Sequence, residues 1–475
     1  MFIVRYSEIG LKGNRTRRNM EQLLIDNIAS AVPENINFKY KKSDGRIFIY
    51  SNSIEFNDIL SRVFGIKSFS QAYEYSFNNI DDIVKTIENN YSKYVKNKTF
   101  AVIASRKGMH SFTSKDLEIA VGDALYNYSS GVNLKNPEAP VYIEVRDTNF
   151  YAFTEKIAGP GGLPLKSEGR GISLFSGGID SPVATYMVMK RGMACDLLFC
   201  SLAHPSDTVY MLNIAKNLFN RYSIGYNPEI YLIDGTALVS SILKNPEQKY
   251  SNLIFKELLY QYAQNLCESH GYDAIITGES IGQVSSQIPS NLNIMSKNIT
   301  YPIFRPLIGF DKEETINYSI AHNLYNKESI GEFCSLFSKN PGINVKSDAL
   351  EVEMKNFPLN DYFRELVAIR YSEIDNYLMS IKSRKVSSIP DNCSVVDLRS
   401  PEDFEKWHVE NAINLNVRDM NNFMGSADKN KGYVFYCKKG LNSAYAVSLM
   451  VSNDFNAFYM TEKELKKENN GIKMH

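Results

Sequence analysis

The sequence predicts a multidomain α/β protein. With 475 residues, the chain is long enough for three or more domains that each bury a core. From residue 171 to about 330, strand-like and helix-like segments alternate, which is typical of a doubly wound parallel sheet with its ligand at the carboxyl ends of the strands. A further α/β pattern begins at residue 386, and two smaller units precede residue 157.

The composition narrows the possible classes of protein. Lysine plus arginine and aspartate plus glutamate both number 53, so the net charge is zero and any nucleic-acid binding must depend on local basic patches. The first residues, MFIVRYSEIG, lack the apolar core of a signal peptide, and no run is long enough to span a membrane, so we expect a cytoplasmic protein without membrane contact. The six cysteines form no CxxC pair, which argues against a structural zinc site and leaves buried or redox-active thiols.

The N-terminal third divides into two units and a linker. Residues 1–57 place a helix-like stretch between two strand-like runs, FIVRY and RIFIY, which predicts a small α+β unit. Residues 58–156 carry helical stretches at 80–95 and 114–128 and three strand-like runs, TFAVIAS, APVYIEVRD and FYAFTEK. Residues 157–170 are rich in glycine and proline and are predicted to form an ordered linker.

The stretch GISLFSGGIDSPVATYMVMKRG at 171–192 begins the alternating region. Residues 172–175 form a short apolar run next to a glycine turn, which predicts a buried strand. Apolar residues then recur at helical spacing from Val183, and we expect Ser181 to cap this helix with Pro182 at its first position.

Two glycines separate this strand from the helix. Gly177 and Gly178 leave their N–H groups unshielded, and a strand, a glycine turn and a helix N-terminus together make an anion site. The alternative is a purely structural turn, but such a turn does not need the flanking Ser176 and Asp180. The pattern therefore predicts a phosphate-binding loop.

The rest of this region, to residue 334, continues the alternation. Strands are predicted at LFCS, EIYLI and DAIITG and helices at 206–221 and 251–269, the second of which ends at Gly271. The stretch TGES at 277–280 follows a strand, so we expect it at the same sheet edge as the glycine loop. Residues 335–385 have a polar helical pattern and are predicted to form a tether.

Residues 386–475 contain a second candidate site, within YCKKGLNSA. Cys437 follows a strand and precedes a turn and a helix start, where backbone N–H groups converge and where Lys438 and Lys439 are adjacent. Both features lower the pKa of a thiol and favour the thiolate. The alternative is an unreactive buried cysteine at a strand end.

Basic residues gather in two N-terminal segments. The cluster LKGNRTRR and the segment SRKGMHSFTSKD are either solvated surface or contacts for RNA phosphates. The candidate RNA-binding residues are Lys12, Arg15, Arg17, Arg18, Arg106, Lys107 and Lys115.

Eight segments together resemble one family. They are RYSEIGLKG (5–13), SRKGMHSFTSKDLEIAVG (105–122), GPGGLPL (159–165), SGGIDSPVA (176–184), TGESIGQVSSQ (277–287), RPLIGFDKEE (305–314), EFCSLFSKNP (332–341) and the Cys437 loop. SGGIDS alone resembles the pyrophosphate loop of the ATP pyrophosphatase superfamily. The whole set resembles the tRNA 4-thiouridine synthetase (ThiI) family in the form that carries a rhodanese domain. The resemblance implies a ferredoxin-like domain at 1–57, a THUMP RNA-binding domain at 58–156, an ATP pyrophosphatase domain at 171–334 and a rhodanese-like domain at 386–475.

The resemblance also implies a reaction. ATP adenylates the C4 oxygen of the uridine at position 8 of tRNA, which turns a poor leaving group into AMP. A cysteine desulfurase loads Cys437 with a persulfide, whose terminal sulfur reaches C4 directly or as released sulfide. Cys334, by itself an ordinary partly buried cysteine, then attacks Cys437 to give a Cys334–Cys437 disulfide that a thiol reductant reopens. Family members also form homodimers and can supply sulfur for the thiazole of thiamin.

The same resemblance assigns roles to individual residues. Asp180 would lie near Mg²⁺ or the reacting α-phosphate, and Lys312 would neutralise charge at that phosphate. Lys256 and Asn442 stand where the family and rhodanese loops commonly have arginine, and Asn411 stands where rhodaneses often have glycine. The implied ATP contacts are Leu174, Phe175, Ser176, Gly177, Gly178, Asp180, Ser181, Phe199, Cys200, Lys256, Gly278 and Gln287, of which Phe199 and Cys200 lie in a stretch that departs from the family pattern.

Two other functions are considered. A pyrophosphate-loop ligase or amidotransferase acting on a small acid would need the glycine loop, but it has no use for basic RNA patches or the Cys437 loop. A non-enzymatic RNA-binding sulfur carrier would need those two features, but it has no use for an intact SGGIDS loop and Lys312.

Overall fold

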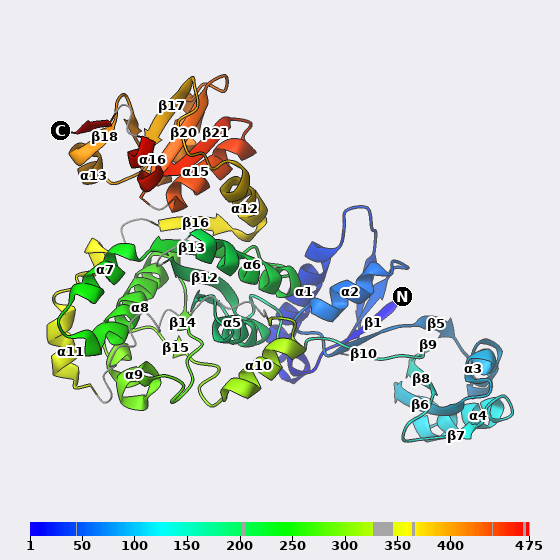
Figure 1. Cartoon of the computed structure of the whole chain (residues 1–475). Coiled ribbons are helices and arrows are strands. Elements are labelled where there is room, and N and C mark those ends of the chain that lie inside the picture. The colour runs from blue at the N-terminus through cyan, green and yellow to red at the C-terminus, as the bar shows by residue number, and fades with distance from the viewer. Residues whose placement is uncertain are drawn as a thin grey trace. The chain divides into compact units, whose positions relative to one another are not determined.

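The computed structural model describes residues 1–43, 45–201, 205–325, 345–362, 366–438, 440–468 and 472–474. These residues form two compact units, 1–167 and 168–475 (Figure 1). Within the described ranges, no helix is both long and apolar enough to cross a membrane.

The first sheet of unit 1 is antiparallel and is covered by α1 (Asn14–Ala31) and α2 (Glu55–Arg62). Its strands, in spatial order, are β10 (Ile157–Ala158), β4 (Ser68–Gln71), β1 (Phe2–Arg5), β3 (Arg46–Tyr50) and β2 (Lys39–Ser43). Because β4 pairs with the free edge of β1, this sheet continues past residue 57, where the sequence placed the end of the first domain. The segment predicted as a linker contributes β10 to the same sheet.

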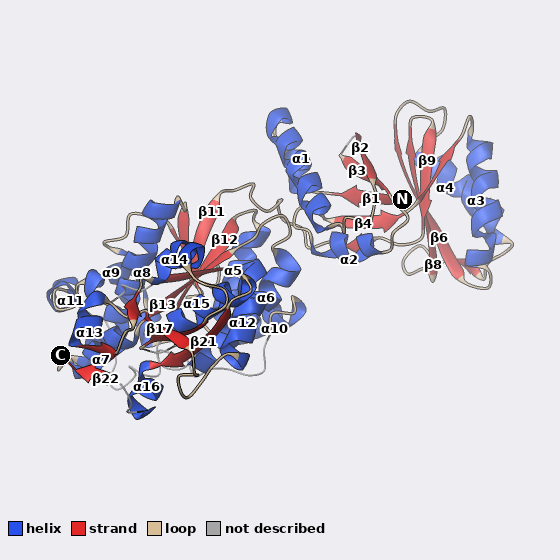
Figure 2. Cartoon of the chain, turned by 90° about the horizontal axis from the view of Figure 1, so that it is seen from above, coloured by secondary structure: helices blue, strands red, loops and turns tan. Residues whose placement is uncertain are grey.

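The second sheet of unit 1 carries α3 (Ile80–Val95) and α4 (Ser114–Tyr126) on one face (Figure 2). Its strands, in spatial order, are β5 (Tyr73–Ser76), β9 (Asn149–Phe153), β8 (Ala139–Arg146), β6 (Thr99–Lys107) and β7 (Gly131–Val132). Side chains cap both helices, since Asn79 accepts a hydrogen bond from the Asp82 N–H and Thr113 forms a capping box with Asp116. Both helices lie where the sequence predicts them.

Unit 2 begins with the predicted doubly wound sheet. Its strands, in spatial order, are β15 (Ile303–Phe304), β14 (Ala274–Ile276), β11 (Arg170–Leu174), β12 (Ala194–Ser201), β13 (Glu229–Asp234) and β16 (Leu366–Arg370), all parallel except the last. On one side, α5 (Asp180–Lys190) packs against α6 (Pro205–Tyr222) and α10 (Lys312–Ala321). On the other, α8 (Ser251–His270) contacts α7 (Thr236–Lys244), α9 (Pro289–Ser296) and α11 (Ser347–Met354). Helix α8 ends at Gly271, as predicted, with a left-handed φ of 69°.

The segment predicted as a polar tether, 335–385, contains structured elements that pack on both of its neighbours. Residues 326–344 lie outside the described part, but α11 buries Leu350 against α8, and β16 adds to the edge of the six-stranded sheet beside β13. Helix α12 (Ile374–Ser383) packs on a helix of the last domain. Buried apolar residues such as Val367 and Tyr377 stabilise this packing. The polar composition of residues 335–385 as a whole does not reveal these individual buried positions.

The last domain has a parallel sheet of β19 (Ile413–Asn414), β17 (Cys393–Asp397), β20 (Gly432–Cys437) and β21 (Asn456–Thr461). A small antiparallel pair, β18 (Trp407–Val409) and β22 (Ile472–Met474), accompanies it. Its helices are α13 (Pro401–Lys406), α14 (Met420–Ser426), α15 (Leu441–Ser452) and α16 (Glu462–Glu468). This fold places Cys437 at the end of a buried strand, directly before α15.

Candidate functional site

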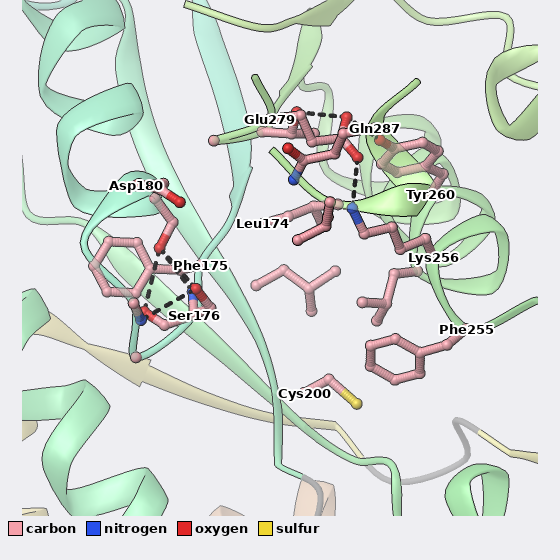
Figure 3. A pocket seen from close by; sticks show the side chains of 18 of the residues that line it. Leu174, Phe175, Ser176, Asp180, Cys200, Phe255, Lys256, Tyr260, Glu279 and Gln287 are labelled. Atoms are coloured by element: carbon pink, nitrogen blue, oxygen red, sulfur yellow. Dashed lines mark hydrogen bonds and ion pairs between the residues drawn. The ribbon is translucent and has the colours of Figure 1, made fainter. Parts of the chain in front are cut away.

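A pocket lies at the carboxyl ends of β11, β12 and β14, where the sequence predicts nucleotide binding (Figure 3). It is lined by every predicted ATP-contacting residue except Phe199. Successive residues of a strand point to opposite faces, and both Leu198 and Cys200 line the pocket, so Phe199 projects away from it into the core. The geometry therefore argues against a side-chain contact from Phe199.

The glycine loop is closed by Ser181, but Ser181 does not cap α5. The helix begins at Asp180, its N-cap position is Ile179, and no side chain caps it, so the predicted cap is wrong and Pro182 is the third helical residue. Instead the Ser181 hydroxyl accepts a hydrogen bond from the Ser176 N–H (2.9 Å) and donates one to the Ser176 carbonyl (3.2 Å). These bonds fix the turn that presents the start of α5 to the pocket.

The predicted residues Asp180 and Lys312 meet at this pocket. The Lys312 ammonium lies 2.9 Å from one Asp180 carboxylate oxygen and 3.1 Å from the other. Gln283, which the sequence analysis did not single out, donates its amide N–H to the same carboxylate at 2.8 Å. Lys312 is the first residue of α10, so its position is set by the loop that follows β15.

Two loops that bring these donors to Asp180 are tied to each other. The Ile281 N–H bonds the Ile308 carbonyl at 3.1 Å, and the Ser280 hydroxyl bonds the Phe310 carbonyl at 2.6 Å. At the base of the first loop, a Cβ on Gly278 would lie 2.8 Å from the Asp180 carbonyl carbon. Only glycine permits this close approach between the end of β14 and the phosphate loop.

A buried glutamate organises the opposite wall of the pocket (Figure 3). The Glu279 carboxylate accepts hydrogen bonds from Lys256 (3.0 Å), Arg305 (2.9 Å), Tyr260 (2.5 Å) and Thr277 (3.0 Å). Burial alone would raise the pKa of Glu279, but Lys256, Tyr260 and Arg305 lower it to about 2. Sequence reasoning noted the TGES stretch without assigning this residue.

Apolar side chains complete the pocket between the phosphate loop and the Glu279 wall. They belong to Leu174, Leu198, Phe255, Leu259 and Val284. A flat, weakly polar ring is the ligand shape that such a surface accommodates, and a charged chain suits the glycine loop beside it. The pocket therefore has the two parts that a nucleoside triphosphate requires.

Cys437 occupies the second candidate site. Its sulfur accepts hydrogen bonds from the N–H groups of Gly440 (3.2 Å) and Ser443 (3.5 Å), as the predicted converging donors require. Gly440 has a φ of 92°, and a Cβ there would lie 3.2 Å from the Thr461 side chain. Lys438 was expected beside the thiol, but its ammonium pairs with Asp403 at 2.6 Å.

Other predicted residues of this site lie elsewhere or outside the described part. Cys334 and Lys439 fall outside the described residues. Asn442, in the place of a rhodanese arginine, is 1% exposed near the start of α15. Asn411 adopts a left-handed φ of 61°, which asparagine tolerates better than most residues, so glycine is not needed there.

The predicted RNA-binding residues all belong to unit 1. Lys12, Arg15 and Arg18 are exposed at or near the start of α1, and Arg17 lies 3.9 Å from Glu21. The others, Arg106, Lys107 and Lys115, are exposed around the turn between β6 and α4. Lys39, Lys41 and Lys42 on β2 are also exposed. They are not among the predicted RNA-binding residues, although the basic run KYKK is a sequence signal of the same kind.

Family models match consecutive parts of the chain. These are the ThiI ferredoxin-like domain at residues 1–70, the THUMP domain at 76–155, the model described as thiamine biosynthesis protein (ThiI) at 166–359, and the rhodanese-like domain at 383–466. The first match ends near the last residue of β4, in agreement with the extent of the first sheet.

Similar proteins cover almost the whole chain. A protein of Thermoplasma acidophilum named tRNA sulfurtransferase is 40% identical over 98% of this chain and 96% of its own length. One of Pyrobaculum aerophilum with the same name is 34% identical over 99% of this chain and 97% of its own. Among solved structures, a 4-thiouridine synthetase in complex with RNA and ATP is 27% identical, with a TM-score of 0.65, over 78% of this chain and 98% of that one.

Proposed function

Because this chain belongs to the ThiI family of tRNA sulfurtransferases, we propose that it replaces the C4 oxygen of uridine 8 in tRNA with sulfur, at the expense of ATP. The observation that carries this proposal is the contact between Lys312 and Asp180 at a pocket with a glycine loop and an apolar wall, in a chain that also has a THUMP domain and a rhodanese cysteine loop. A small-molecule ligase has no need of the last two features.

In the first step, the uridine C4 oxygen attacks the α-phosphorus of ATP, pyrophosphate leaves, and an O4-adenylated uridine forms. The glycine loop and the N-terminus of α5 would hold the β- and γ-phosphates, and the Lys312 ammonium would offset the charge that develops at the α-phosphate. A single carboxylate beside bound phosphates is a common Mg²⁺ arrangement, and Asp180 fits it. Bound Mg²⁺ would neutralise phosphate charge there.

In the second step, sulfur displaces AMP. A cysteine desulfurase would leave a persulfide on Cys437, whose terminal sulfur attacks C4 or is released as sulfide that does so. On the direct route, the Cys334 thiolate then attacks the Cys437 sulfur, which releases thiolated tRNA and forms the Cys334–Cys437 disulfide. On the sulfide route, the same attack comes first: it breaks the persulfide bond, releases sulfide that then attacks C4, and forms the same disulfide. A thiol reductant reopens that disulfide and restores both thiols. The N–H groups of Gly440 and Ser443 would stabilise the Cys437 thiolate, which accepts the persulfide sulfur from the desulfurase and forms again when the disulfide is reduced.

Nucleoside mass spectrometry tests the proposal. The purified chain is incubated with tRNA, ATP, Mg²⁺, cysteine and a cysteine desulfurase, and we expect 4-thiouridine in wild-type tRNA but not in a transcript with cytidine at position 8. Pyrophosphate release that responds to a small carboxylic acid and not to tRNA would favour a ligase instead. Tight tRNA binding with no pyrophosphate release would favour a non-enzymatic carrier.

Three further parts of the proposal come from the family resemblance. We place the protein in the cytoplasm with its tRNA substrate, and we propose that it acts as a homodimer, which sedimentation of the full chain checks. The ThiI model's description, a thiamine biosynthesis protein, supports a second role in sulfur supply for thiazole synthesis. Growth of a deletion strain without thiamin tests that role separately from tRNA thiolation.

A further inference from the structure

We propose that the exposed edge of the junction face of unit 1, at Lys39 and Lys41 of β2, binds the RNA phosphate backbone. The junction face is the side of the first sheet that packs against the second sheet, together with the residues that meet it there. This inference rests on the proposed function, because it takes RNA to be the ligand of unit 1. It adds Lys39 and Lys41 to the predicted residues at the start of α1 and around the turn between β6 and α4, and Arg146 connects the two sets because it lies opposite Lys107 in the β6–β8 pair.

Strand register places Lys39 and Lys41 on this face. In the β2–β3 pair, Lys41 lies opposite Phe48 and Lys39 lies opposite Tyr50, and directly opposed residues share a face. Phe48 packs on Tyr151 of the second sheet, with ring centroids 4.8 Å apart. The face of the first sheet that carries Phe48 is therefore the face that packs against the second sheet. Lys42 is on the other face, where its ammonium bonds Gln22 of α1 at 3.1 Å.

Three arginines lie on the same face, farther from the edge strand β2, and each comes from a different strand. Arg5 and Arg46 are paired across β1 and β3, and Arg146 comes from β8. All three approach Glu144, at 2.7, 3.3 and 3.7 Å respectively. Burial alone would raise the pKa of Glu144, but Arg5 and Arg46 hold it below its usual value. One buried carboxylate therefore orients three guanidinium groups across the boundary between the two sheets.

The junction face has more positive than negative charge. Lys156 also belongs to it, with its ammonium 4.5 Å from the centre of the Tyr142 ring, and burial followed by the nearby Arg5 lowers the pKa of Lys156. Its cations are Arg5, Lys39, Lys41, Arg46, Arg146 and Lys156, and its carboxylates are Glu144 and Glu74, the latter bonded to Tyr151 and Asn149. A polyanion such as an RNA backbone is the ligand that this imbalance favours.

Lysines on an edge strand have a second explanation. They can prevent unwanted pairing of β2 with another chain, in which case they contribute to solubility and not to RNA binding. The two explanations differ in their consequences for the salt dependence of tRNA affinity, because only a phosphate contact releases counterions.

The experiment compares two variants of the full chain by tRNA binding at several salt concentrations. The double change Lys39→Ala and Lys41→Ala should weaken binding and reduce the slope of log affinity against log salt by about 1 for each lysine. Lys42→Ala is the matched control, since it removes the same charge from the opposite face of the same strand. Lys39→Arg with Lys41→Arg should retain the wild-type slope, because phosphate contacts need only the charge.

Two results overturn the proposal. One is an unchanged slope in the double alanine variant with normal folding by circular dichroism, whether or not its self-association increases. The other is a loss in Lys42→Ala that equals the loss in the double variant. Thiolation assays separate this inference from the proposed function: wild-type thiolation with an unchanged slope rejects the surface alone, and a reduced slope in a chain that never thiolates tRNA rejects the proposed function alone.

Discussion

The Lys312 ammonium lies within 3.1 Å of both Asp180 carboxylate oxygens, although 132 positions separate the two residues in the chain. Asp180 is the first residue of α5, directly after the phosphate loop, and Lys312 is the first residue of α10, directly after the loop that follows β15. Their pairing places the two charges that adenylation would use beside each other at the phosphate loop. Phosphate groups entering the pocket would compete with Asp180 for Lys312, and Mg²⁺ would compete with Lys312 for Asp180.

Removing either charge should stop adenylation and leave tRNA binding intact. We expect Asp180→Asn and Lys312→Met each to reduce tRNA-dependent pyrophosphate release by at least about 100-fold, as loss of a preorganised electrostatic group does elsewhere. The measurement is pyrophosphate release at saturating ATP, with tRNA affinity as the internal control because its predicted contacts lie in unit 1. Near-normal turnover in either variant would show that the pair serves only packing.

Gln283 should act as a positioning residue for Asp180. Its amide bond to the carboxylate is a hydrogen bond to a charged group, worth about 1.5–3 kcal/mol, so Gln283→Ala should lower the adenylation rate by roughly 10–100-fold. The KM for ATP should change much less than kcat. Gln261→Ala is the control, since Gln261 bonds the carboxylate of Glu257 on α8 in the same domain and does not line the pocket. Equal effects of the two changes would refute a specific role.

Glu279 predicts a pH dependence of stability. Its pKa is about 2 in the folded chain, below its usual 4.5, so the stability it contributes is present above pH 4.5 and is lost as the pH falls toward 2. Glu279→Gln should lower the melting temperature of the nucleotide domain strongly at pH 7, since Lys256 and Arg305 then lack their carboxylate. The difference between variant and wild type should shrink as the pH is lowered from 5 to 3. A constant difference would contradict the assigned pKa.

The phosphate loop could be predicted from residues that are adjacent in sequence. The contacts of Glu279 could not, because they join residues that are far apart in the chain. A strand, two glycines and a helix start are adjacent in sequence, so residues 172–183 revealed the loop directly. Two partners of Glu279, Lys256 and Tyr260, lie one turn apart on α8, but Arg305 follows β15 and Glu279 itself follows β14, so no local pattern links the carboxylate to its partners. The resemblance assigns the neighbouring residues Phe199 and Cys200 together, but successive residues of a strand point to opposite faces, and only the Cys200 side chain lines the pocket.

The segment 335–385, predicted as a tether, also has a structure that depends on contacts with residues far away in the chain. Residues 366–370 form β16 because β13 has an open edge, with Ile230 opposite Ile369, and that edge cannot be seen in the segment itself. Ser181 also differs from its prediction. A serine before a helical pattern usually caps the helix, whereas here its hydroxyl accepts a hydrogen bond from the Ser176 N–H within the loop. Helices α3, α4 and α8 were predicted well because their caps and periodicity are contained in their own sequences.

The disulfide predicted between Cys334 and Cys437 can be tested by peptide mapping after a single round of thiolation. After one round of thiolation with limiting reductant, non-reducing peptide mapping should recover a linked peptide containing both residues. Cys334→Ser should remove that peptide and restrict the chain to about one turnover. Full multiple turnover in Cys334→Ser, with no linked peptide in the wild type, would exclude Cys334 as the resolving thiol.

Cys437→Ser should separate sulfur delivery from adenylation. Cys437 is 2% exposed at the end of β20, and its sulfur accepts hydrogen bonds from the N–H groups of Gly440 and Ser443, whereas Asp180 and Lys312 belong to the nucleotide domain. Serine cannot form a persulfide, so thiolation driven by a desulfurase and cysteine should fall to background. Added sulfide should still thiolate tRNA slowly, because the adenylated uridine forms without Cys437.

Cys393→Ser is the matched control for this change. Cys393 is a half-buried cysteine at the start of β17 in the same domain, paired in register with Gly432, and its thiol lacks converging N–H donors among the described contacts. We therefore expect wild-type activity with either sulfur source. Loss of sulfide-driven thiolation in Cys437→Ser, with pyrophosphate release also lost, would mean that the last domain is needed for adenylation itself. Loss of thiolation with pyrophosphate release retained would instead mean that Cys437 places the sulfur even when sulfide is supplied from solution.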